Sequence, residues 1–405
     1  MTRRSLLQTL SIAAAGHAVP HASAQRGRRR RPYDILIKNG EVRDPSRDLK
    51  ARADVAIHDG KIAEVAFDIP AERGRDVVDA KGLYVTPGLV DLHTHCVFGV
   101  RSGIEADPIA ARSGTSTWID AGTFAYNQVE GFRRHIVERN KCRVFGFVYL
   151  YPASRNPDID PVKYVNDVME RTGRAAAANR DIILGVKFQV GSNMNGRHSL
   201  EFLKIARGLC DEYDLRLLSH ISLAPPETNE VMELMKPGDV ITHCFNEHTL
   251  GIVDRDTGKL KPSVKEARLR GVLFDVGHGS GSFNFKSARQ ALDQGFLPDS
   301  ISTDIYSANV NGPVFDLPTT MSKLLYLGMS FDEVLNCSTV NPARVVTPLP
   351  KLGTLRVGAP GDVALLSVDD GEFELVDAQR NKVTAKQRIV SHLTICKGKR
   401  LVVAV

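Results

Sequence analysis

The sequence predicts an α/β protein in which a (β/α)8 barrel is joined to a small β-sandwich built from both ends of the chain. Three observations support this prediction. The chain has 405 residues, enough for one large barrel and a small second domain. Its middle alternates short apolar stretches with helical stretches, which gives eight repeats over about 260 residues. Short β-like stretches with turn signals lie on both sides of this middle.

Composition excludes several classes of protein. Hydrophobic residues make up 42% and charged residues 25%, as in soluble globular proteins. The net charge is +6, but seven of the 53 basic residues and no acidic residue lie in residues 1–31. The rest of the chain is nearly neutral, so we expect no nucleic-acid partner. The six cysteines lack Cys-x-x-Cys spacing, which argues against a zinc ribbon.

Residues 1–31 resemble a bacterial twin-arginine export signal. Arg3-Arg4 precedes a short apolar segment, and Ala22-Ser23-Ala24 offers a small-x-small cleavage site. The apolar segment is too short to span a bilayer. The resemblance implies that the twin-arginine machinery exports the folded protein, which is then periplasmic or secreted. A basic leader on a cytoplasmic protein is the alternative, because the Arg26–Arg31 stretch is unusual after such a site.

The β-sandwich is predicted in two parts, residues 32–86 and 353–405. Asn39-Gly40 and Asp59-Gly60 are hairpin turn signals in the first part. The expected strands are Asp34–Lys38, Asp54–His58, Lys61–Ala66, Asp76–Asp79 and Leu83–Val85, then Asp362–Val368, Phe373–Asp377, Ile389–Cys396 and Lys399–Val405.

The barrel is predicted over residues 87–352. Its eight expected strands are Leu89–His93, Thr115–Ala121, Arg143–Leu150, Ile182–Val190, Arg216–Ser222, Val240–Phe245, Gly271–Val276 and Ser300–Ile305. The expected helices include Val129–Asn140, Pro161–Ala178, Leu200–Tyr213, Val264–Arg270 and Ser287–Gln294.

Candidate metal ligands lie at or near the ends of five of these strands. His93 and His95 are two residues apart, so they point to the same side of the first strand. In a barrel of this kind, functional residues lie at the C-terminal ends of the strands. The candidates are His93, His95, Lys187, His220, His243 and Asp304.

With these residues, the chain resembles the amidohydrolase superfamily, in particular its two-metal members with a carboxylated lysine. The segment Thr86-Pro87-Gly88-Leu89-Val90-Asp91-Leu92-His93-Thr94-His95 is similar to the opening motif of that superfamily. Phe274–Gly279 and Asn311–Pro318 are similar to the dihydroorotase-related deacetylases. The resemblance covers nearly the whole chain after the leader and implies a homo-oligomer.

The resemblance also implies a set of ligands. His93, His95 and Asp304 would hold one divalent ion and His220 and His243 a second, with zinc expected at both. Desolvation lowers the pKa of a buried lysine, so Lys187 as a free amine could take up carbon dioxide and bridge the metals as a carbamate. A Lys187 ammonium beside Asp304 and a single metal is the alternative.

The predicted activity is that of a metal-dependent amidohydrolase. A hydroxide held by the metals attacks an amide or ester carbonyl, and Asp304 passes its proton to the leaving group. Such enzymes act on C–N bonds other than peptide bonds, and the subgroup resemblance implies deacetylation of a small carboxylate-bearing molecule. A cyclic-amide hydrolase of the dihydroorotase type, a mononuclear deaminase and a non-catalytic scaffold remain as alternatives.

Residues that contact the small-molecule substrate are harder to predict. His278 lies in a glycine-rich loop after the seventh strand and is one candidate. The others follow earlier strands and are Thr123, Tyr149, Tyr151 and Asn246.

Overall fold

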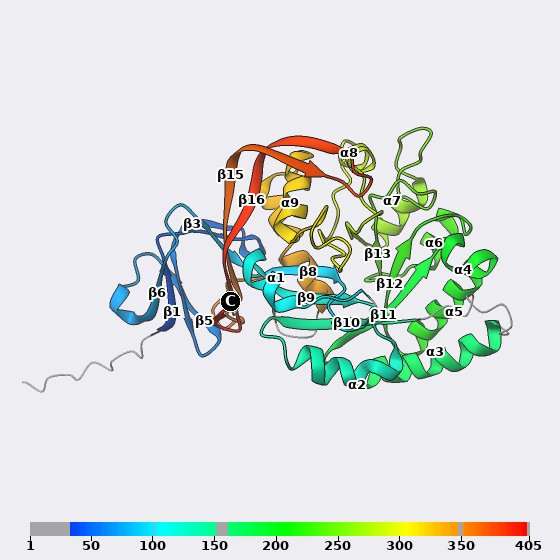
Figure 1. Cartoon of the computed structure of the whole chain (residues 1–405), viewed down its shortest axis with the longest axis horizontal. Helices are drawn as coiled ribbons and strands as arrows, with labels where there is room; N and C mark the ends of the chain where they lie inside the picture. Colours follow the sequence, from blue (N-terminus) through cyan, green and yellow to red (C-terminus); the bar gives the residue numbers. More distant parts are fainter. Residues whose placement is uncertain (1–32, 101, 151–160, 347–350, 403–405) are drawn as a thin grey trace, which may run out of the picture. The chain divides into compact units, whose positions relative to one another are not determined.

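The computed structural model describes residues 33–100, 102–150, 161–346 and 351–402 (Figure 1). The proposed export leader and Tyr151 lie outside these residues. Among the helices that the structure describes, none combines the length and the apolar character that crossing a bilayer would need.

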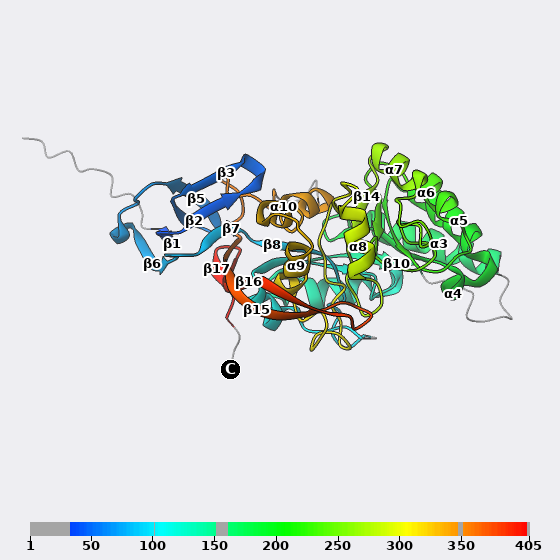
Figure 2. The same cartoon turned by 90° about the horizontal axis from the view of Figure 1, so that it is seen from above.

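The β-sandwich consists of two sheets, and the second contains strands from both ends of the chain. The first sheet has the order β5-β4-β1-β6, and the second has the order β17-β16-β15-β7-β2-β3. Figure 2 shows the C-terminal strands β15 to β17 close to β7 of the N-terminal part. Strand β15 pairs with β7 antiparallel, so that Val363 lies opposite Pro87. The strands are β1 Tyr33–Lys38, β2 Glu41–Asp44, β3 Leu49–Arg52, β4 Asp54–His58, β5 Lys61–Ala66, β6 Gly74–Asp79, β7 Tyr84–Pro87, β15 Val363–Val376, β16 Lys382–Cys396 and β17 Lys399–Arg400.

Strands β15 and β16 form one long hairpin instead of several short strands. We expected separate strands at Asp362–Val368 and Phe373–Asp377, and the turn-forming dipeptide Asp370-Gly371 lies between them. In the structure the register shifts between Asp370 and Phe373, so a bulge absorbs the extra residues and the strand continues. The hairpin runs along α9 (Leu317–Tyr326), as Figure 1 shows.

The tip of this hairpin is bonded to the loop that follows β14. The Ala378 backbone N–H donates to Phe283 O at 3.0 Å. The Phe285 N–H donates to Asp377 Oδ2 at 3.2 Å. The C-terminal part of the chain therefore holds a loop of the barrel in place.

Seven parallel strands, in the order β8 to β14, form the barrel sheet, so the predicted barrel with a β-sandwich is confirmed. They are β8 Leu89–Thr94, β9 Thr115–Ala121, β10 Arg143–Tyr149, β11 Ile183–Val190, β12 Arg216–Ile221, β13 Val240–Thr242 and β14 Leu273–Asp275. The helices are α1 Ala106–Ser113, α2 Val129–Phe132, α3 Pro161–Ala178, α4 Ser192–Asn195, α5 Ser199–Glu212, α6 Thr228–Leu234, α7 Pro262–Leu269, α8 Phe285–Leu292, α9, α10 Phe331–Asn336 and α11 Val340–Ala343.

The eighth predicted strand, Ser300–Ile305, is not a regular strand. Single parallel bridges join Ser300 to Asp275 and Ile305 to Thr94, so the segment still lies between β14 and β8. Between these bridges, the Asp91 carboxylate accepts from the Thr303 N–H and hydroxyl. Asp304 has a left-handed φ of 48°, which no strand tolerates.

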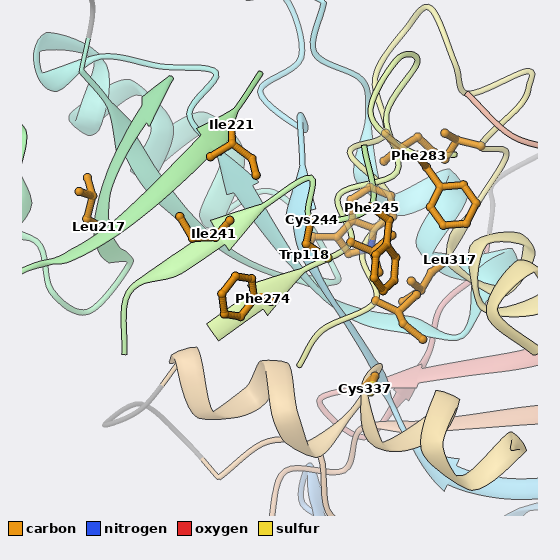
Figure 3. Close-up of a cluster of buried hydrophobic side chains, with 14 of the residues drawn as sticks. Trp118, Leu217, Ile221, Ile241, Cys244, Phe245, Phe274, Phe283, Leu317 and Cys337 are labelled. Carbon is orange, nitrogen blue, oxygen red and sulfur yellow. The ribbon is translucent and has the colours of Figure 1, made fainter. Parts of the chain in front are cut away.

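The main hydrophobic core lies between the barrel strands and the helices. Ile241 of β13 lies opposite Phe274 of β14 in the sheet register, and both side chains are fully buried. Figure 3 shows these two side chains with Leu217, Phe245 and other members of this region. Such packing fixes the strands, and the strands in turn position the polar residues at their C-terminal ends.

Candidate metal centre

A cavity of about 290 Å³ lies at the C-terminal ends of the barrel strands. All six candidate ligands line it, although they come from five different segments of the chain. The lining residues are His93, His95, Ser102, Ala121, Gly122, Thr123, Tyr149, Lys187, Gln189, His220, His243, Asp304 and Tyr306.

Three ligand-type side chains converge in this cavity. One ligand atom from each of His93, His95 and Asp304 lies within 4.8 Å of the others. Asp304 Oδ1 is 3.0 Å from His95 Nε2 and 3.5 Å from His93 Nε2. The left-handed backbone at Asp304 turns this residue out of strand geometry, and His243 is similar, with a φ of 68°. Such strain is concentrated at functional sites.

His93 and His95 are each oriented through a threonine by a buried aspartate. The Thr242 hydroxyl donates to Asp275 Oδ2 at 2.7 Å, so it accepts from His93 Nδ1, also at 2.7 Å. A hydroxyl has a single proton, so these bonds fix the tautomer of the imidazole. Nδ1 carries the hydrogen, and the lone pair of Nε2 faces the cavity.

A second series of hydrogen bonds, from Asp120 through Thr123, orients His95. Thr123 donates to Asp120 Oδ2 and lies 2.8 Å from His95 Nδ1. The Asp120 carboxylate also accepts from the backbone N–H groups of Cys96, Gly122 and Thr123, which fixes its position. Outer partners of this kind orient metal-ligating histidines.

His220, His243 and Lys187 complete the ring. The His220 and His243 rings meet edge to face with centroids 4.3 Å apart. His243 Nδ1 donates to Gly277 O at 2.6 Å, which leaves its Nε2 as a lone-pair donor. Lys187 Nζ lies 3.2 Å from His93 Nε2. Imidazole nitrogens with a carboxylate make a donor set that suits zinc-like ions.

Burial keeps these groups in the protonation states that metal binding needs. Desolvation, with the charge of Lys187, lowers the pKa of His220 to about 3 and that of His93 well below its usual value. Desolvation also lowers the pKa of His243. His93, His220 and His243 are therefore neutral near pH 7. Desolvation lowers the pKa of Lys187 to about 8, so part of this lysine is a free amine.

The loop Gly277–Gly279 packs directly on the ligands. A Cβ at Gly277 would lie 2.8 Å from His243 Nδ1, and one at Gly279 would lie 2.4 Å from Asp304 Oδ2. Both glycines also have positive φ angles, +48° and +56°. The glycine-rich pattern after the seventh strand thus permits a close approach of backbone to ligands.

The structure gives the proposed substrate contacts different surroundings. Thr123 and Tyr149 line the cavity, whereas Tyr151 is outside the described residues. His278 is fully buried, with Nε2 2.8 Å from Lys323 Nζ, and is not among the described lining residues. Asn246 donates to the carbonyls of Ile221 and His243 and is also outside that lining.

Sequence reasoning missed several residues of the site. Asp120 and Asp275 reach the ligands only through threonines, so no spacing along the chain identifies them. Gln189 and Tyr306 also line the cavity. Gln189 had a signal, because it lies two residues after Lys187 and so shares its face of the strand.

Histidines and a carboxylate that converge at the C-terminal end of a parallel barrel define a metal-binding hydrolase site. Comparison with known families agrees with this class. The chain belongs to the amidohydrolase family, because residues 84–401 match the model described as Amidohydrolase family.

Relatives match most of the chain. A protein of Enterococcus faecalis named deacetylase is 34% identical over 90% of this chain and 98% of its own length. A deacetylase of Brucella anthropi is 33% identical over 79% of this chain and 80% of its own length. Among solved structures, one described as an adenine deaminase has a TM-score of 0.82 and 34% identity, covering 91% of this chain and 99% of its own. One described as a dihydroorotase has a TM-score of 0.80 and 30% identity, covering 90% and 97%.

Proposed function

We propose that this amidohydrolase is a deacetylase that uses two divalent metal ions, both zinc, and a carbamate on Lys187. The observation that carries the proposal is the position of Lys187. The residue is 2% exposed and lines the cavity, and its Nζ lies 3.2 Å from His93 Nε2, among ligand-type side chains. An ammonium there would repel a metal, whereas a carbamate would bind one.

The remaining ligands divide between two positions in this proposal. His93, His95 and Asp304 would hold one ion, and His220 and His243 the other, with Lys187 between them. The bound ions supply Lewis acidity, which polarises a carbonyl and acidifies water. Asp304 is the proton carrier, because its carboxylate lies at the cavity and is 13% exposed.

Deacetylation is supported by the names of the two relatives, which match most of the chain. The expected substrates are small N-acetyl or O-acetyl carboxylates. Cyclic-amide hydrolysis is the second candidate, because a structure described as a dihydroorotase has 30% identity over nearly its full length. Deamination is the third, because another similar structure is described as an adenine deaminase.

The test combines metal content, native mass and a substrate panel. The proposal predicts close to two metal ions per chain, about 44 Da of added mass at Lys187, and release of acetate. One metal ion with an unmodified lysine and release of ammonia from purines would instead favour the deaminase. Opening of dihydroorotate without acetate release would favour the cyclic-amide hydrolase.

We also propose that residues 1–31 direct twin-arginine export and that the folded protein is a periplasmic homo-oligomer. The supporting residues are Arg3-Arg4 and the Ala22–Ala24 site. Fusion of residues 1–31 to a reporter, in cells with and without the twin-arginine machinery, tests the export. Light scattering of the purified protein tests the oligomer.

A further inference from the structure

Gln189 lines the cavity, and its side-chain amide has no role in the proposed metal centre. The Tyr149 hydroxyl donates to Gln189 Oε1 at 2.6 Å, so the oxygen of this amide is turned toward Tyr149. The Nε2 group then points away from Tyr149 with two hydrogens. Within the described part of the chain, Nε2 has no hydrogen-bond partner, although Gln189 lines the cavity.

The register of the barrel places Gln189 beside the ligands. On β11 it lies opposite His220 of β12, and Tyr149 of β10 lies opposite Lys187. Gln189 and Lys187 share the inner face because they are two residues apart. Two rises along a parallel strand are about 6.6 Å, so the backbone of Gln189 lies one layer nearer to the cavity mouth than that of Lys187.

This layer is where the part of a substrate beyond the reacting carbonyl would lie. Apart from Lys187 and Asp304, the polar side chains that line the described cavity are neutral or are metal-ligating histidines. The neutral ones are Ser102, Thr123, Tyr149, Gln189 and Tyr306. Amide and hydroxyl donors of this kind bind an oxygen acceptor without requiring that it be charged.

We propose that Gln189 determines substrate specificity: its Nε2 group donates a hydrogen bond to an oxygen on the leaving-group side of the substrate. The oxygen belongs to a carboxylate or to an uncharged carbonyl, which share this acceptor chemistry. Tyr149 is a positioning residue, because its hydroxyl holds Oε1 and so aims Nε2. The proposal rests on the proposed deacetylase function, since it assumes an acetylated substrate in this cavity.

The test measures kcat/KM of the metal-loaded wild type and variants on a set of substrate analogues. The substrates are N-acetylalanine, its primary amide, and N-acetylisopropylamine, which lacks the second oxygen. For Gln189→Leu we expect kcat/KM to fall about 10- to 100-fold on the first two, mostly through KM. On the third we expect a change of less than about threefold, because its contacts do not involve the amide.

Further measurements distinguish the two kinds of oxygen. Gln189→Glu replaces a donor with an acceptor, so repulsion between two carboxylates predicts a larger loss on N-acetylalanine than on its amide, and equal losses on both would contradict a contact between residue 189 and this oxygen. For the wild-type enzyme, a higher kcat/KM on N-acetylalanine than on its amide indicates a carboxylate, and a higher value on the amide indicates an uncharged carbonyl. Tyr149→Phe should lower kcat/KM in the same direction as Gln189→Leu, and the double variant should be no worse than Gln189→Leu alone.

Gln387→Leu is the matched control, because this glutamine is exposed on β16. Metal content and melting temperature should stay those of the wild type in every variant. A loss with Gln189→Leu that is equal on all three substrates, or no loss on any, would overturn the role of Gln189. Absence of acetate release by the wild-type enzyme on any acetylated substrate would overturn the deacetylase function and this proposal with it.

Discussion

Two buried lysines, Lys187 and Lys323, differ in what surrounds them. Each has its Nζ near the Nε2 of a histidine, at 3.2 Å from His93 and 2.8 Å from His278 respectively. Desolvation lowers the pKa of Lys187 to about 8 and that of Lys323 to about 7. Lys187 lines the cavity, whereas Lys323 is fully buried under the hairpin β15–β16 and donates to Pro313 O at 2.8 Å.

Burial is common to the two amines, but their surroundings differ. Lys323 has a carbonyl acceptor and a histidine, so its hydrogens are used inside the protein. Lys187 has ligand-type neighbours and lines the cavity. The lowered pKa is common to both lysines, and access to the cavity is what would let Lys187 form the proposed carbamate.

The largest effect should come from the same substitution at the two lysines. Lys187→Met removes the amine that would bridge the metals, so we expect metal content to fall below half and hydrolysis to fall more than about 100-fold, beyond the effect of an outer partner. Lys323→Met should keep the metal content of the wild type. Elemental analysis and acetate release check both. Equal metal content in the two variants would remove the distinction between these lysines.

Substitution of Gly279 should lower the activity nearly as much. Gly279 lies against Asp304, and its carbonyl oxygen is 2.8 Å from His278 Nδ1, so this loop contacts both environments. In Gly279→Ala the new Cβ would lie 2.4 Å from Asp304 Oδ2, at a φ of +56°. We expect kcat to fall on the order of 100-fold because Asp304 is displaced.

Gly281→Ala is the control, since no described atom beyond its chain neighbours lies within 4 Å of a Cβ at this position, and it belongs to the same loop. Its kcat should be that of the wild type. Steady-state kinetics of both variants check the prediction. If both lose kcat equally, the loop is generally intolerant and the contact with Asp304 is not the cause.

A smaller effect is expected from substitution of Thr242, whose hydroxyl is bonded to His93. Thr242→Val removes the hydroxyl that joins His93 Nδ1 to Asp275, so metal affinity should fall about 10- to 100-fold. Thr117→Val is the control, because the hydroxyl of Thr117 is buried without a hydrogen-bond partner among the described residues. Titration of both variants with a metal chelator measures the affinity. An unchanged affinity in Thr242→Val would show that His93 does not need this bond.

The candidate ligands could be selected from the sequence because each lies at or near the end of an apolar strand, and the structure brings all six to one cavity. The pair His93 and His95 and the alternation of strands and helices are local patterns. The chains through Thr123 and Thr242 were not predictable. Thr242 and Asp275 reach His93 only when the barrel closes, with segment 300–305 between β14 and β8. We expected His278 near the substrate because it lies in a glycine-rich loop. In the structure, its Nε2 lies 2.8 Å from Lys323 Nζ.

Pairing with other segments also explains the two differences in strands. Asp370-Gly371 is a local turn dipeptide, and the pairing of Asp370 with Gln387 and of Phe373 with Ala385 in the hairpin overrides it. Segment 300–305 keeps backbone hydrogen bonds to the chain on both sides, but in its middle Thr303 is bonded to the side chain of Asp91, a residue more than 200 positions away. Neither contact can be read from the propensity of the segment that it changes.

The smallest effect should be a difference between the wild type and Lys323→Met in how the free energy of unfolding depends on pH. The folded pKa of Lys323, about 7, is below the unfolded value of 10.5, so between these pH values the unfolded chain binds more protons. The free energy of unfolding therefore gains from this group as pH rises from 7 to 10, by up to about 1.4 kcal/mol per pH unit. Lys323→Met lacks this gain. The charged or titratable groups that face Lys323 are His278, Asp316 and Asp377.

Chemical denaturation of the wild type and Lys323→Met at several pH values measures the difference, in which groups common to both proteins cancel. Lys386→Met is the control. The side chain of Lys386 is 73% exposed, so this variant should keep the pH slope of the wild type. Lys187 cannot give a clean slope in the metal-loaded protein, since a carbamate there would not titrate as an amine. A slope that Lys323→Met loses and Lys386→Met keeps would show that the Lys323 amine takes up a proton on unfolding. The same slope with and without Lys323 would mean that its amine keeps its proton, bonded to Pro313 O, throughout this range.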